Sequence, residues 1–151
     1  MKPNIDFLAG HIAELLEYML NRNNPIDETV AYFFKSRRYL GSHDRAFISE
    51  NVYGIIRHRR MIEEVLHQIF SSLSFHTSQN YLFYFLVYSL LQNKEREDDS
   101  IFTEKLSARW EKYNYEISLA YFLQTANEIV NKQLVVPKRK ENFGLLYSYP
   151  D

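Results

Sequence analysis

Apolar residues recur at three- and four-residue steps along most of the chain, the spacing of one face of an α-helix. We predict a first helix from Ile5 to Leu20, ended by the polar segment Asn21 to Asn24. Asn24 suits the N-cap of a second helix and Pro25 its first helical position. This second helix is expected to stop before Gly41, a residue suited to a left-handed helix cap.

The remaining apolar patterns predict five more helices with short connections. They cover, in chain order, Ser42 to Arg57, Ile62 to Leu73, Tyr81 to Leu91, Ser100 to Trp110 and Glu116 to Asn131. The stretch from Tyr81 to Leu91 is apolar on every side, which indicates a helix at the centre of a bundle. Seven helices joined in this way predict an all-α helical bundle.

The composition fits one helical domain with an aromatic core. A chain of 151 residues suits a single domain, and 12 Tyr and 11 Phe supply large apolar side chains. The absence of Cys excludes disulfides, thiolate zinc sites and cysteine nucleophiles. Four glycines leave little room for a phosphate-binding glycine-rich loop. Because neither a targeting segment nor a membrane span is evident, we expect a cytoplasmic protein without a membrane partner.

Basic residues are concentrated between Lys35 and Arg60. This segment contains seven Lys or Arg and two acids, a local balance of +5, whereas the whole chain carries −1. The other residues together therefore carry −6. One positive segment in an otherwise acidic domain suggests a polyanionic partner that binds on one side.

The sequence contains no pattern typical of a metal or catalytic site. His58, His67 and His76 are nine residues apart, which places successive side chains on opposite faces of a helix. No His-x3-His pair or nucleophile motif accompanies them. We therefore expect no metal and no catalytic site in these residues.

Four short segments resemble parts of a known family. The matching residues are Pro25-Ile26-Asp27, Leu40 to Ala46 (LGSHDRA), Val52 to Arg57 (VYGIIR) and the tail Leu146 to Asp151 (LYSYPD). This stretch resembles the N-terminal NusB-like domain of the Sun/Fmu (RsmB-type) ribosomal RNA cytosine-5 methyltransferases. The resemblance covers about 35 central residues and the last six.

The resemblance implies a NusB-like helical domain over residues 1–136. Residues 137–151 would then be a linker toward a methyltransferase domain that is absent from this chain. In that family the helical domain assists RNA binding, and S-adenosylmethionine and two catalytic cysteines belong to the later domain. The expected role is accessory and non-catalytic: binding of ribosomal RNA during rRNA processing, with the parent's own catalytic domain as a second partner. We expect these residues to bind no S-adenosylmethionine by themselves.

The candidate RNA-binding residues are the cations at the hinge between the second and third helices and those beyond it: Lys35, Arg38, His43, Arg57, Arg59 and Arg60. Arg45 is assigned a structural role, because it lies on the same helical face as Val52 and is expected to point inward. Asp44, in a first helical turn, and Gly41 are also assigned structural roles. Arg37 fits either a helix C-terminus or a phosphate contact, and both interpretations stay open.

Two other functions remain open. The chain could be a stand-alone NusB-like antitermination factor that binds a protein through its helices, or a small enzyme of another type. Phosphate binding weakens steeply with salt, whereas an apolar protein interface hardly responds, so salt dependence separates the first two functions.

Overall fold

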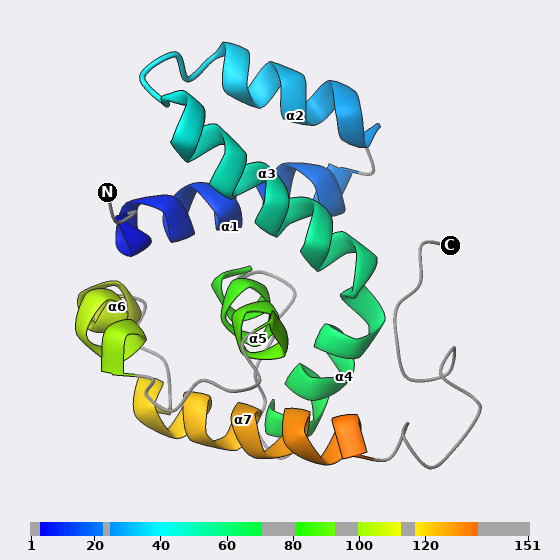
Figure 1. Cartoon of the computed structure of the whole chain (residues 1–151), viewed down its shortest axis with the longest axis vertical. Helices are drawn as coiled ribbons and strands as arrows, with labels where there is room; N and C mark the ends of the chain where they lie inside the picture. The colour runs from blue at the N-terminus through cyan, green and yellow to red at the C-terminus, as the bar shows by residue number, and fades with distance from the viewer. Residues whose placement is uncertain (1–3, 23–24, 71–80, 93–99, 113–116, 136–151) are drawn as a thin grey trace.

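The computed structural model describes residues 4–22, 25–70, 81–92, 100–112 and 117–135. These ranges form seven α-helices and contain no strand, which confirms the predicted all-α fold (Figure 1). The helices are α1 (Ile5–Arg22), α2 (Ile26–Lys35), α3 (Ser42–Arg57), α4 (Arg59–Phe70), α5 (Leu82–Gln92), α6 (Ser100–Lys112) and α7 (Leu119–Val135). None of these helices is long and apolar enough to cross a membrane.

Helix α5 lies at the centre of the bundle, as its sequence predicts. Every residue from Leu82 to Leu91 is buried. Five helices form a closed ring around it, because α1 contacts α6, α6 contacts α7, α7 contacts α4, α4 contacts α3 and α3 contacts α1 (Figure 1). Helix α2 is outside this ring and packs on α1.

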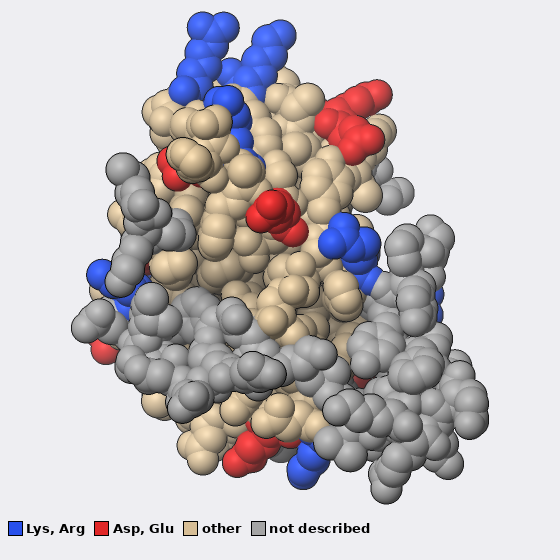
Figure 2. Space-filling view, in the orientation of Figure 1, with Lys and Arg blue, Asp and Glu red and all other residues tan. Residues whose placement is uncertain are grey.

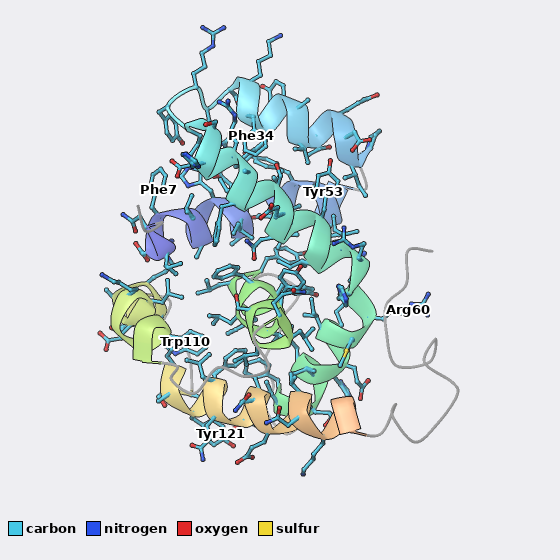
Figure 3. The ribbon with its side chains drawn as sticks, viewed as in Figure 1. Phe7, Phe34, Tyr53, Arg60, Trp110 and Tyr121 are labelled. Carbon is cyan, nitrogen blue, oxygen red and sulfur yellow. The ribbon has the colours of Figure 1, made fainter. Side chains whose placement is uncertain are left out.

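Aromatic side chains from four helices meet beside α5. The Phe83 ring lies 5.1 to 5.4 Å, centroid to centroid, from the rings of Phe70, Trp110 and Phe122. The indole N–H of Trp110 donates a hydrogen bond of 2.8 Å to the carbonyl of Ile117, so its burial leaves no unsatisfied donor (Figure 3). The predicted aromatic core is therefore confirmed, and Trp110 belongs to it.

The connection between α2 and α3 differs from the prediction. Helix α2 ends at Lys35, with Ser36 as its C-cap, five residues before the expected stop. Pro25 is the N-cap position of α2 rather than its first helical residue. Gly41 has φ −77° and ψ 178°, an extended conformation, so the left-handed cap predicted for it is wrong. Gly41 instead precedes α3 as its N-cap residue.

Part of the predicted organisation lies outside the described residues. This applies to the expected linker at residues 137–151 and to Leu73, the last apolar residue of the fourth predicted stripe. The last helix begins at Leu119 and ends at Val135, a few residues after the predicted bounds.

Helix α3 lies close to α5 at Gly54. A Cβ atom built on Gly54 would overlap the phenol ring and hydroxyl of Tyr88. Gly54 and Tyr88 are both buried, so an added Cβ atom would force one of the two helices or the Tyr88 ring to move within the packed core. The absence of a side chain at Gly54 therefore allows α3 to pack against α5.

Gly54→Ala should lower the free energy of unfolding by about 1–2 kcal/mol, because the overlap costs more than the gain in helix propensity. Gly41→Ala is the matched control, because a Cβ there meets nothing within 4 Å. Its effect should stay within about 0.5 kcal/mol, since a poorer N-cap and a less flexible unfolded chain offset each other. Urea denaturation measures the free energy of unfolding of both variants. Equal losses for the two variants would contradict the assignment of the close contact to Gly54.

A hydrogen bond between Tyr53 on α3 and Asp27 on α2 should make alkaline stability pH-dependent. The Tyr53 hydroxyl donates to Asp27 Oδ1 at 2.7 Å. This bond, together with burial, raises the pKa of Tyr53 to about 12 from an ordinary value of 10.0. Between these two values the unfolded chain has lost the proton that the folded chain keeps. The stability contribution is thus complete below pH 10 and is lost as pH rises toward 12.

Tyr53→Phe should accordingly lose less stability than the wild type between pH 10 and 12. The difference between the two urea midpoints, followed across this window, isolates Tyr53 from the other tyrosines. Parallel curves for the two proteins would rule out this linkage.

Candidate nucleic-acid interface

The chain makes a tight, hydrogen-bonded turn between α2 and α3. The N–H of Arg37 donates to the carbonyl of Phe34, and the N–H of Leu40 donates to the carbonyl of Arg37, both at 3.1 Å. Leu40 is buried at the end of the turn. Arg38 and Tyr39 therefore lie at an exposed tip that is fixed by the residues on either side.

Three predicted RNA-binding side chains gather around this tip. Lys35, Arg38 and His43 are exposed, and none makes a side-chain hydrogen bond or ion pair with the described part of the chain. Figure 2 shows basic side chains that project into solvent at the α2–α3 end of the molecule. We call Lys35, Arg38, His43 and Arg45 the hinge group.

Arg37 is directed at α1, unlike its exposed neighbour Arg38. Its side chain is only 16% exposed, and Nη2 donates to Glu14 Oε2 on α1 at 2.7 Å. The guanidinium also lies 3.8 Å from the centre of the Phe33 ring. Burial opposes the charged form, but the bond and charge of Glu14 leave the pKa of Arg37 above its ordinary value. Arg37 therefore links α2 to α1.

The expectation that Arg45 points inward is wrong. Its side chain is exposed, although one guanidinium nitrogen donates to the carbonyl of Leu40 at 2.8 Å. Arg45 lies in the first turn of α3, just after the connection from α2. It therefore holds the turn from outside while its charge stays in solvent. Asp44 is half-buried in the first turn of α3.

The other three predicted residues lie where α3 meets α4. We call Arg57, Arg59 and Arg60 the junction group; all three are exposed, and Figure 3 shows Arg60 pointing away from the bundle. Arg57 makes no side-chain hydrogen bond or ion pair with the described residues. Arg59 is less available, because its Nε donates to Glu63 Oε2 at 3.1 Å, as its four-residue spacing predicts.

The partner of Arg59 is itself held by a buried tyrosine. The Tyr84 hydroxyl on α5 donates to the same Glu63 oxygen at 2.7 Å. Burial and this bond raise the pKa of Tyr84, so it remains a neutral donor. The hydrogen bond from Tyr84 therefore helps to hold the Glu63 carboxylate beside Arg59.

An acidic residue separates the two basic groups. His43, Glu50 and Arg57 are exposed and seven residues apart on α3, so they share one face at steps of about 10.5 Å. Figure 2 also shows acidic atoms between the basic atoms at the α2–α3 end and those further down this face. The basic segment of the sequence therefore forms two basic groups about 20 Å apart along α3.

Two features near the hinge combine residues that the sequence interpretation did not place together. Phe7 and His11, on α1, contact Tyr39 in the turn between α2 and α3. A cavity of about 420 Å³ also lies between α1 and α2 and is lined by Tyr18, Pro25, Glu28, Thr29, Tyr32, Phe33 and Arg37. The aromatic contacts and the cavity each combine side chains from segments that are distant in the chain. A pattern within one helix does not predict such contacts.

Within the described ranges, no group of three or more His, Cys, Asp or Glu side chains could hold a metal ion. No family model, curated protein or solved structure matches this chain. The interpretation of the interface therefore depends on its geometry and on the motifs between Pro25 and Arg57.

The opposite environments of Arg37 and Arg38 predict opposite effects on stability. Arg37→Ala should lower the free energy of unfolding by about 1–3 kcal/mol, because Glu14 and the Phe33 ring lose their partner. Arg38→Ala should change it by less than about 0.5 kcal/mol. Thermal or urea denaturation of the two variants tests this pair. A larger loss for Arg38→Ala would show that the turn is stabilised by its tip instead.

Proposed function

We propose that this chain is an accessory RNA-binding domain, NusB-like, of an S-adenosylmethionine-dependent ribosomal RNA cytosine-5 methyltransferase. It would bind RNA in the cytoplasm and leave the chemistry to the parent's catalytic domain. The observation that supports this most directly is that three exposed cations, Lys35, Arg38 and Arg57, pair with none of the described residues, on a chain of net charge −1.

The spacing of these cations favours contacts to phosphates rather than to bases. The hinge and junction groups are about 20 Å apart along α3, a distance that covers several phosphates of one strand. Exposed Lys and Arg side chains contact phosphates without reading sequence. Glu50 between the groups opposes continuous binding, so we expect modest affinity that tolerates many sequences and falls with salt.

The resemblance supports the same proposal from the sequence. The motifs at Leu40 to Ala46 and Val52 to Arg57 include Arg45, which holds the turn, and Gly54, which allows α3 to approach α5. These residues shape the ends of α3, where the two basic groups lie. S-adenosylmethionine would bind in the catalytic domain of the proposed parent.

Salt titration of RNA binding tests this proposal. Replacing Arg38 and Arg57 together by Gln should reduce the slope of log affinity against log salt by about 1.4, at about 0.7 per phosphate contact on a single strand. Lys105→Gln with Lys132→Gln is the matched control, because both lysines are exposed on α6 and α7 and the change in net charge is equal. This control pair should retain the wild-type slope.

Fluorescence anisotropy with a labelled single-stranded RNA at several salt concentrations provides the measurement. Equal slopes for the two double variants would contradict phosphate contacts at Arg38 and Arg57. Binding of a protein partner that is insensitive to salt, without RNA binding, would favour the antitermination-type module instead.

A further inference from the structure

An exposed aromatic cluster lies directly beside the hinge group. Tyr39 is 66% exposed and Phe7 is 36% exposed, and their ring centroids are 6.4 Å apart. His11 lies between them, with its ring centroid 4.5 Å from that of Phe7 and 5.7 Å from that of Tyr39. The buried Phe33 ring packs against His11, with the two ring centroids 6.2 Å apart.

Hydrogen bonds hold this cluster in place. His11 Nδ1 lies 2.9 Å from the carbonyl oxygen of Phe7, which can only accept, so Nδ1 is the donor. In the neutral ring, Nε2 is then an acceptor, and the Tyr39 hydroxyl donates to it at 2.9 Å. Tyr39 is therefore fixed at its hydroxyl end by His11 and at its backbone by the turn, while its ring remains largely exposed to solvent.

The charges around the cluster favour an anionic partner. Arg38 is the neighbour of Tyr39 in the chain, and Lys35 ends α2 just before the turn. The nearest acids on α1 are already paired: Asp6 with Arg109 on α6, and Glu14 with Arg37, each at 2.7 Å. Exposed cations and an aromatic surface thus occur together, without an unpaired α1 carboxylate beside them.

We propose that Phe7 and Tyr39, held by His11, form a stacking surface for unpaired bases of single-stranded RNA. An aromatic ring stacks on any base, and adjacent cations bind the backbone of the same strand. A ring that is already fixed loses little conformational freedom on binding, which favours this use over that of a mobile tyrosine. The inference depends on the proposed RNA-binding function and specifies which form of RNA the hinge group takes.

Two other exposed tyrosines provide controls within the same chain. Tyr32 on α2 is 71% exposed and Tyr121 on α7 is 54% exposed. The hydroxyl of neither is hydrogen-bonded to the described residues. If exposure alone determined RNA affinity, Tyr32, Tyr39 and Tyr121 would contribute equally to it. The stacking surface predicts instead that, of these three tyrosines, only Tyr39 contributes.

The experiment compares three RNA probes by fluorescence anisotropy. They are a labelled single strand of about 12 nucleotides, the same strand with abasic central nucleotides, and the same strand annealed to its complement. The wild type should bind the intact strand about tenfold more tightly than the abasic strand, and more tightly than the duplex, in which bases are not available for stacking.

Single substitutions test which residues cause the preference for the intact strand over the abasic strand. Tyr39→Ala should remove most of the preference for the intact strand, because only the less exposed Phe7 ring remains, whereas Tyr39→Phe, which keeps the ring, should retain most of it. Tyr32→Ala and Tyr121→Ala should bind as the wild type does. Circular dichroism and urea denaturation of each variant verify that the fold is intact.

The outcomes separate this inference from the proposed function. A preference for the intact strand that persists undiminished in Tyr39→Ala, together with loss of binding when Arg38 and Arg57 are replaced, would overturn the stacking surface and keep the phosphate contacts. Absence of binding to all three probes in the wild type would overturn both. Loss of affinity in Tyr39→Ala that is equal for intact and abasic strands would also overturn stacking, because it would not depend on the base.

Discussion

The fold depends on one constraint, the burial of a helix that has no polar face. All ten residues from Leu82 to Leu91 are buried, and four of them are aromatic. Burial of one large apolar side chain is worth about 1.5–3 kcal/mol, so α5 cannot be stable with any side in water. It requires helices in every direction. The ring α1–α6–α7–α4–α3 meets this requirement, and it combines helices that precede α5 with helices that follow it.

The same constraint determines where the basic groups lie. Because the ring is complete without α2, this helix packs on the outside of α1 and is held by Val30, Phe33, the Arg37–Glu14 pair and the Tyr53–Asp27 bond. The turn after α2 therefore extends beyond the core. Side chains at its tip reach solvent because of this position, whereas Arg37, only one residue earlier, is directed at α1.

The sequence was informative where a property belongs to one helix and uninformative where it depends on the neighbour. Periodicity predicted seven helices, and the unbroken apolar stretch identified the central one. The burial of Arg45 was mispredicted, because a helical wheel gives the direction of a side chain and not whether another helix lies there.

Arg37 and Arg38 are adjacent residues of the same type, and they differ because Arg37 pairs with Glu14, which lies 23 residues earlier in the chain. The aromatic cluster could not be predicted for the same reason, since Phe7 and His11 are on α1 and Tyr39 follows α2.

Ion pairing also lowers the positive charge that the segment from Lys35 to Arg60 presents to a ligand, below its formal balance of +5. Arg37 and Arg59 are neutralised by Glu14 and Glu63, acids that lie outside the Lys35 to Arg60 segment. The charge that a ligand meets is therefore smaller than the formal count and is divided between the two ends of α3. Two weak groups about 20 Å apart can still bind one strand well, because contact at the first raises the effective concentration of the strand at the second. Affinity in such an arrangement depends on a strand long enough to reach both groups, so the length of the RNA should matter more than its sequence.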